Sequence, residues 1–312
     1  GANSFLYSEF APFSLKNNTL FSEEFDDLYS SVKGAVAECN HVFIKGNNLN
    51  ERFENLEENS KFYIGEIGFG IGINFLTTCK SWLNHTKQNQ VLEFYSFDKY
   101  LFRLRDFKKL NVSCPDLKEY ISELELSYPR NIQGVQKISL FHGRIILNLI
   151  IGEIDSTQEY IELMNKVDAW FLDGFSPSKN PDLWSKKLFK CIHKSCHEKT
   201  TFSTYTSSGL VKNNLTESGF THNREEGFSE KRHMLKGTVD TQLKKNTSNT
   251  KVAVIGSGIA GCILSYTLAK KGIEVDLYEK SDNICSGASS HELLVTYPRL
   301  SAHDTSFGSF TL

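Results

Sequence analysis

The sequence lacks long apolar runs and has no marked excess of either charge. None of its apolar stretches reaches the roughly 18 residues of a membrane helix, so we expect no membrane span. The start of the chain also lacks the basic residues and apolar segment of a secretory signal. The formal net charge is −2, which excludes a basic surface over the whole molecule. Any nucleic-acid partner would therefore need a local basic patch.

Cysteine is sparse, with seven residues scattered over 312 positions. This usage suits a reducing compartment, and we expect a cytoplasmic protein. The one cluster that resembles a metal motif contains Cys191, His193, Cys196 and His197. We expect these four side chains on a single helix, from which tetrahedral ligation is difficult. The sequence therefore predicts no metal site.

The chain does have a glycine-rich corner. Phe62–Ile64 is predicted to be a buried strand and Ile73 to about Leu83 a helix, and the turn between them contains Gly65, Gly68, Gly70 and Gly72. A strand, a glycine turn and a helix form the nucleotide-binding corner of an open α/β sheet. Glycine lets the backbone turn sharply and approach a ligand closely. A turn without a ligand is the alternative.

Further buried strands alternate with helices. We predict strands at His41–Ile44, Val91–Phe97, Ile145–Ile151, Val167–Leu172, Thr200–Tyr205, Phe220–Glu225 and His233–Thr238, and helices at Leu101–Leu110, Leu117–Leu126, Gln158–Met164, Pro181–Cys191 and Ser208–Ser218. This alternation predicts an α/β fold with a mostly parallel, doubly wound sheet, whose ligands lie at the carboxyl ends of the strands. Four candidate residues fall at such ends: Gly68, Asp98, Glu153 and Asp173. A carboxylate such as Asp98 can accept hydrogen bonds from both hydroxyls of a ribose.

A second motif follows the strand that ends at Leu172. It reads Asp-Gly-Phe-Ser-Pro-Ser-Lys-Asn-Pro from Asp173 to Pro181. If an amine is methylated here, Asp173 can accept the proton that the amine loses, and Phe175 can offer its π-face to a cation. The alternative is a plain turn stiffened by Pro177.

Another nucleotide corner begins at Lys251. Lys251–Ile255 is a predicted strand, Ile263–Lys271 a helix and Glu274–Tyr278 a second strand, and the motif residues between and after them are Gly256, Gly258, Gly261 and Glu279. This is the full dinucleotide fingerprint in a βαβ context. The segment after the linker is short, and a domain this small would be marginal alone.

We expect four segments. Residues 1–60 form an N-terminal elaboration, 61–236 the core, 237–250 a polar linker, and 251–312 a βαβ segment of a truncated Rossmann domain. Candidate contacts to a nucleic acid are Lys179, Asn180, Lys231 and Arg232. Taken singly, such residues are more often part of a solvated surface, and this alternative stays open.

These motifs together resemble one family. The turn Glu66-x-Gly68-x-Gly70-x-Gly72 is similar to that of class I methyltransferases, which bind S-adenosylmethionine (SAM). Together with Phe25–Tyr29, Asp168–Pro181, Lys231–Leu235 and Gly287–Ser289, it resembles the bifunctional MnmC proteins of tRNA wobble-uridine modification. The resemblance implies a Rossmann-like SAM-dependent methyltransferase that acts on the aminomethyl group of the wobble uridine of tRNA, and a half that uses FAD as an oxidoreductase.

The resemblance also implies roles for individual residues. Asp173 and Phe175 are expected to be catalytic, and SAM is expected to bind Glu66, Gly68, Gly70, Gly72, Asn74, Asp98, Glu153 and Asp173. Glu153 stands where the family has Asp, and Ser290-His291 depart from the family's pattern. FAD would bind Gly256, Gly258, Gly261 and Glu279, but the oxidase reaction is not expected of a segment that ends this early.

Two other functions remain open on the sequence. The chain is alternatively a flavin- or nicotinamide-dependent oxidoreductase that uses Gly256–Gly261, or a non-catalytic tRNA-binding scaffold. A monomer is the expected oligomeric state.

Overall fold

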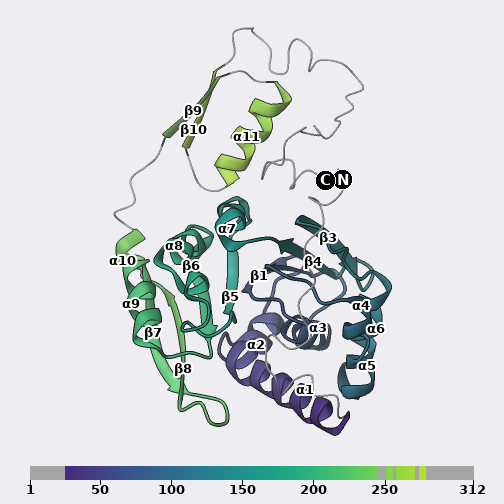
Figure 1. Cartoon of the computed structure of the whole chain (residues 1–312). Coiled ribbons are helices and arrows are strands. Elements are labelled where there is room, and N and C mark those ends of the chain that lie inside the picture. The colour runs from purple at the N-terminus through teal and green to yellow at the C-terminus, as the bar shows by residue number, and fades with distance from the viewer. Residues whose placement is uncertain (1–24, 245–250, 256–257, 271–273, 279–312) are drawn as a thin grey trace, which may run out of the picture. The chain divides into compact units, whose positions relative to one another are not determined.

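The chain folds into two compact units that meet in the sequence between Asp240 and Thr241. The computed structural model describes residues 25–244, 251–255, 258–270 and 274–278. The larger unit carries an eight-stranded sheet and the smaller one a two-stranded sheet (Figure 1). Each unit therefore has a sheet of its own.

Five adjacent strands of the large sheet are parallel. The strands are β1 (Lys61–Ile67), β2 (Val91–Asp98), β3 (Gly134–Leu140), β4 (Ile145–Ile151), β5 (Val167–Leu172), β6 (Cys196–Thr204), β7 (Phe220–Glu226) and β8 (His233–Val239). Their order is β3-β4-β2-β1-β5-β6-β8-β7. Strands β4, β2, β1, β5 and β6 are parallel, and β3, β8 and β7 are antiparallel to their neighbours. The predicted doubly wound α/β sheet is confirmed. Its strand order reverses between β1 and β5, and ligands of such sheets bind outside the strand ends at this reversal.

Helices cover both faces of the sheet. They are α1 (Phe25–Cys39), a π-helix (Asn40–Lys45), α2 (Leu49–Glu54), α3 (Ile73–His85), α4 (Leu104–Phe107), α5 (Leu110–Ser113), a 3₁₀-helix (Pro115–Leu117), α6 (Lys118–Leu126), α7 (Ile154–Leu163), a 3₁₀-helix (Pro181–Trp184), α8 (Lys186–Lys194) and α9 (Gly209–Glu217). Side chains alternate between the faces along each strand. Accordingly, Phe171 of β5 joins a core cluster with α3 and α6, whereas Trp170 joins another with α7, α8 and α9.

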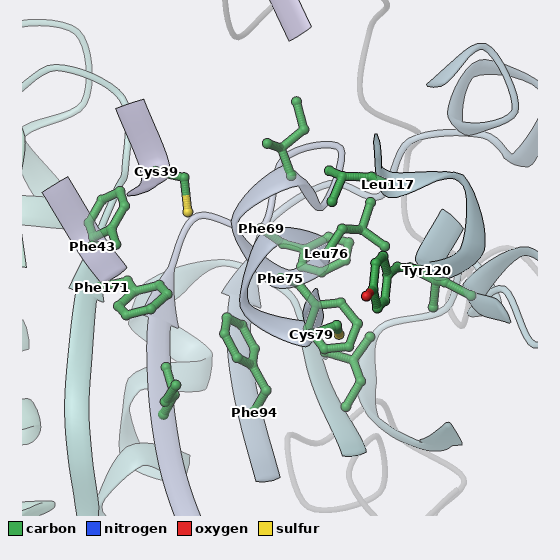
Figure 2. Close-up of a cluster of buried hydrophobic side chains, with 14 of the residues drawn as sticks. Cys39, Phe43, Phe69, Phe75, Leu76, Cys79, Phe94, Leu117, Tyr120 and Phe171 are labelled. Atoms are coloured by element: carbon green, nitrogen blue, oxygen red, sulfur yellow. The ribbon is translucent and has the colours of Figure 1, made fainter. Parts of the chain in front are cut away.

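Aromatic rings fill the first of these clusters (Figure 2). Phe43 of the π-helix stacks on Phe171 with ring centroids 4.9 Å apart. Phe75 of α3 meets Phe94 of β2 edge-on at 5.1 Å. Such pairs contribute about 0.5–1.5 kcal/mol each beyond the burial of their area. The contacts hold the π-helix and α3 against the two strands that flank β1.

The predicted strand at His41–Ile44 is wrong. A π-helix covers Asn40–Lys45 instead, and its residues Val42, Phe43 and Ile44 are all buried. A short apolar run does not distinguish a buried strand from a buried helical turn. Here the run packs against the sheet as part of a helical layer.

Between β2 and β4 the chain differs from prediction in two elements. The predicted helix Leu101–Leu110 is divided into the short helices α4 and α5. Strand β3 is not predicted, because it is a partly exposed edge strand without a clear apolar alternation.

The placement of Cys191, His193, Cys196 and His197 on one helix is also wrong. Helix α8 ends at Lys194, and Cys196 and His197 lie on β6. His197 Nδ1 accepts a hydrogen bond from the Lys199 amide at 3.0 Å, and its Nε2 donates to Asp168 Oδ1 at 2.7 Å. Within the described ranges no group of three or more His, Cys, Asp or Glu side chains is arranged to hold a metal ion.

The smaller unit contains the second βαβ motif. Strands β9 (Lys251–Ile255) and β10 (Glu274–Tyr278) are parallel, and α11 (Ile259–Lys270) connects them (Figure 1). Both predicted strands are confirmed, and the helix begins before the predicted Ile263. Gly258 and Gly261 lie in the described part of this motif, whereas Gly256 and Glu279 lie outside it.

The expected linker at 237–250 begins with regular structure, and its residues 245–250 lie outside the described part of the chain. Strand β8 runs to Val239, and the short helix α10 (Thr241–Lys244) follows. None of the helices in the described part of the chain has both the length and the apolar character to cross a membrane.

Candidate functional site

The turn between β1 and α3 depends on backbone angles that favour glycine. Gly68, Gly70 and Gly72 have φ values of +94°, +57° and +91°. A Cβ on Gly68 would lie 2.5 Å from the carbonyl oxygen of Asp173. Only glycine therefore lets the end of β1 lie directly against the end of β5.

Two carboxylates meet at one amide beside this turn. Asn74, in the first turn of α3, donates from Nδ2 to Glu66 Oε2 at 3.0 Å and to Asp173 Oδ2 at 2.8 Å. Ser96 of β2 donates from its hydroxyl to Glu66 Oε1 at 2.7 Å. Glu66 is fully buried, whereas Asp173 is half-buried. Asn74 thus fixes the Asp173 carboxylate at the carboxyl edge of the sheet.

The next strand end adds a third carboxylate. Asp98 accepts a hydrogen bond from the Gly70 amide at 2.8 Å, so the glycine turn and the end of β2 hold each other. Lys99 Nζ forms an ion pair with Glu153 Oε1 at 2.6 Å, which joins the segments after β2 and β4. The Asp98 and Glu153 carboxylates each have more acceptor positions than these contacts use, so both can accept further hydrogen bonds.

Two pockets lie along this edge. The first pocket is lined by Gly68, Gly70, Phe97, Asp98, Lys99, Tyr100, Phe102, Gly152, Glu153, Ile154, Gly174, Phe175, Asn180, Asp182 and Leu183. The second pocket is lined by Ala35, Glu38, Cys39, Phe43, Phe69, Ile71, Ile73, Asn74, Asp173, Gly174, Phe175, Ser176, Lys179, Tyr205 and Lys231. Gly174 and Phe175 belong to both linings, so they form a shared wall.

Hydrogen bonds from two aromatic side chains hold this wall. Tyr205 donates from its hydroxyl to the Gly174 carbonyl at 2.8 Å, and Trp184 donates from Nε1 to the Phe175 carbonyl at 2.6 Å. The rings of Tyr205 and Trp184 meet edge-on with centroids 5.9 Å apart. The backbone at Gly174–Phe175 is therefore anchored on the side of β6 and of the 3₁₀-helix 181–184.

Burial and negative charge change the acidity of two groups in the second pocket. Burial raises the pKa of the Cys39 thiol, and the nearby Glu66 and Asp173 carboxylates raise it further. Burial also raises the pKa of the Tyr205 hydroxyl, with smaller contributions from Asp173 and Glu38. Both groups are therefore neutral at pH 7, mainly because they are buried.

Known protein families match both units of the chain in sequence. Residues 115–240 match the sequence model of a family described as S-adenosyl-L-methionine-dependent methyltransferase, and residues 251–304 match that of FAD dependent oxidoreductases. The chain is 37% identical to the tRNA 5-methylaminomethyl-2-thiouridine biosynthesis bifunctional protein MnmC of Marinomonas sp. (strain MWYL1), over 93% of this chain and 45% of the relative. The chain belongs to the MnmC family.

Other MnmC proteins agree with this placement. The MnmC protein of Nitrosospira multiformis is 35% identical over 95% of this chain and 48% of its own length. The chain thus spans about half the length of the curated relatives it matches. The crystal structure of MNMC2 from Aquifex aeolicus is similar in fold, with a TM-score of 0.53 and 23% identity over 65% of this chain and 60% of that one.

The structure places the sequence-predicted residues of this MnmC family chain in different parts of the site. Asp98, Glu153 and Asn180 line the first pocket, while Asn74, Asp173, Lys179 and Lys231 line the second. Phe175 lines both. Glu66 lies beneath them as a buried acceptor, and Arg232 is exposed and lines neither pocket.

Sequence reasoning missed three residues of the second pocket: Glu38, Cys39 and Tyr205. Glu38 and Cys39 end α1, well before the glycine turn in the sequence. Tyr205 directly follows β6. Its place after a parallel strand was the available signal, because every such strand end reaches the same edge.

Proposed function

We propose that this chain is a SAM-dependent methyltransferase that methylates the aminomethyl group on the wobble uridine of tRNA. The observation that carries the proposal is the pair of pockets that share the Gly174–Phe175 wall, with Asp173 beside it in the second pocket. One pocket suits the methyl donor and the other the acceptor. The names of the MnmC relatives supply the identity of the acceptor.

The residues of the first pocket fit SAM. The close approach at Gly68 leaves no room for a side chain, and the backbone of the glycine turn is open to the pocket through Gly68 and Gly70. The Asp98 carboxylate would accept from ribose hydroxyls, and Glu153 would bind near the adenine. Glu66, Gly72, Asn74 and Asp173 would complete the site, and the carboxylates of Glu66 and Asp173 supply negative charge that suits the cationic end of SAM.

The bound donor supplies a methyl group on a positively charged sulfur. Transfer forms a carbon–nitrogen bond to the acceptor amine and breaks the carbon–sulfur bond, and the amine gives up one proton. The Asp173 carboxylate takes this proton, and Asn74 keeps that carboxylate in place. Phe175 presents its ring at the wall between the pockets, where a cation and the amine meet. Positioning of this kind supplies most of the rate in an in-line displacement.

We further propose that tRNA contacts the basic side chains near the second pocket. Lys179 and Lys231 line it, Arg232 is exposed next to Lys231 in the sequence, and Asn180 lines the first pocket. Phosphate contacts by such residues predict binding that weakens with salt. We also propose a cytoplasmic location, which a tRNA substrate supports.

The smaller unit is proposed to belong to an FAD-binding domain. Its βαβ motif and its match to FAD dependent oxidoreductases support this assignment. Gly256, Gly258, Gly261 and Glu279 would hold the dinucleotide by the fingerprint geometry. No oxidation step is assigned to these residues.

The decisive experiment is Asp173→Ala. We expect methyl incorporation into tRNA that lacks the final methyl group to fall by at least about 10²-fold. SAM binding, measured by calorimetry, is expected to stay within a few fold. Asp155→Asn, an exposed change on α7 outside both pockets, is the matched control. Loss of SAM binding with equal loss of turnover would instead place Asp173 in the cofactor site alone.

A further inference from the structure

An ammonium group already lies between a carboxylate and an aromatic ring in the second pocket. Lys231 Nζ is 2.7 Å from Glu38 Oε1 and 4.2 Å from the centroid of the Tyr205 ring. These three residues come from three separate parts of the chain: the hairpin between β7 and β8, helix α1 and the segment after β6. All three line the second pocket.

The aromatic part of this arrangement is fixed. The Tyr205 hydroxyl donates to the Gly174 carbonyl, and its ring packs edge-on against the buried Trp184. The ring therefore keeps its position whether or not Lys231 lies over it. A ring face beside a carboxylate is a general binding site for an ammonium ion.

The cation, by contrast, is able to leave. The Lys231 side chain is 47% exposed, and its hairpin has a second attachment to the neighbouring π-helix. There His41 Nε2 donates to the Glu226 carbonyl at 2.8 Å, and the His41 ring faces Phe228. Loss of the Lys231–Glu38 pair would thus leave the hairpin attached.

The charged side chains of the pocket are balanced only while Lys231 lies in it. Its lining contains the carboxylates of Glu38 and Asp173 and the ammonium groups of Lys179 and Lys231. Without the Lys231 side chain, the two carboxylates of the pocket share it with one ammonium group, and Glu38 loses the cation with which it is paired beside the aromatic face. An acceptor that carries a primary ammonium supplies the same chemical group as Lys231.

We propose that Glu38 and Tyr205 form the entry site for the protonated amine of the acceptor, and that Lys231 fills this site until the acceptor displaces it. This inference rests on the proposed function, because it concerns the same acceptor. Displacement frees Lys231 for a phosphate of the tRNA. The captured amine then lies in the pocket that contains Asp173, where its proton is removed before methyl transfer.

The test uses nucleosides, because they carry no phosphate for Lys231 to bind. Binding of 5-aminomethyl-2-thiouridine and of 2-thiouridine to the full chain is measured by calorimetry in the presence of S-adenosylhomocysteine. We expect the aminomethyl nucleoside to bind about tenfold more tightly. Glu38→Gln removes this preference, and Tyr205→Leu reduces it more than Tyr205→Phe, which keeps the ring.

Lys231→Met gives the sharpest outcome. It strengthens binding of the aminomethyl nucleoside several fold and leaves 2-thiouridine unchanged, because the competitor is gone. Weaker or unchanged binding of the aminomethyl nucleoside by Lys231→Met would overturn the inference, as would a preference that survives Glu38→Gln. Melting temperatures and affinity for S-adenosylhomocysteine identify any variant that has lost its fold.

The proposed function is tested separately by methyl incorporation into tRNA with the unchanged chain. If methylation occurs but the nucleosides bind equally, the entry site is rejected and the function stands. If the preference is present but no methyl group is incorporated, the function is rejected and the cation site stands.

Discussion

The Asn74 amide joins carboxylates from two strands, Glu66 of β1 and Asp173 after β5. Its two N–H groups satisfy one oxygen of each. We expect Asn74→Ala to lower the free energy of unfolding by about 1–3 kcal/mol, since both carboxylates lose this donor in a largely buried place. Denaturant unfolding at pH 8 measures the change.

Asn74→Asp is expected to destabilise the protein more than Asn74→Ala does. Its total cost in unfolding free energy is expected to be about 3 kcal/mol or more at pH 8, because it places a third carboxylate beside two others. The loss shrinks as the pH falls and one carboxyl takes up a proton. Asn223→Asp on the exposed face of β7 is the control, with an expected change within about 0.5 kcal/mol. Equal stability of Asn74→Asp and Asn74→Ala at pH 8 would contradict this account of the site.

At the scale of one element, the turn between β1 and α3 depends on Gly68. Alanine there would take a positive φ of +94° and place its Cβ 2.5 Å from the Asp173 carbonyl oxygen. This oxygen belongs to the main chain, which cannot move away from the new Cβ as the end of a flexible side chain could. We expect Gly68→Ala to cost at least about 2 kcal/mol of unfolding free energy and to weaken SAM binding, measured by denaturant unfolding and calorimetry.

Gly34→Ala is the matched control for that turn. Gly34 lies in α1, where an added Cβ would meet nothing within 4 Å. Helix propensity then predicts stabilisation by about 0.5–1 kcal/mol. If Gly68→Ala were as well tolerated as Gly34→Ala, the close contact between β1 and β5 would not hold in solution.

The elements with a strong apolar pattern were predictable from the sequence. The strand Ile145–Ile151 and the strand Val167–Leu172 have the predicted bounds, because buried parallel strands are apolar on both faces. The edge strand β3 and the π-helix at Asn40–Lys45 were not predictable in this way. The edge strand needs only part of its surface buried, and a π-helix has no distinctive sequence period.

The same distinction applies to the site. Asp98 and Asp173 directly follow predicted strands and Gly68 lies in the predicted glycine turn, so the sequence already predicts that they share one edge of the sheet. Glu38 and Lys231 enter through α1 and a hairpin that fold back over this edge. Their proximity depends on tertiary packing between segments far apart in the chain, which no local pattern encodes.

At the scale of the whole molecule, the two units differ in how much core they contain. Both large hydrophobic clusters consist of residues between Val32 and Val239, all in the larger unit. In the described part of the smaller unit, large apolar side chains such as Ile255, Ile263 and Tyr266 are exposed. The described core clusters of the larger unit are thus built from its own residues.

This separation predicts the behaviour of a chain that ends at Asp240. Strand β8 is complete at Val239, and the Asp240 amide still donates to the Gly219 carbonyl at 2.8 Å. We expect the melting temperature of the main transition to stay within about 2 °C, since in a domain of this size 1 kcal/mol corresponds to roughly 2–4 °C. SAM affinity should also be unchanged, because both pockets lie within residues 35–231. A larger fall in either quantity would mean that the smaller unit supports the larger one, and that the methyltransferase cannot be treated as a separate folding unit.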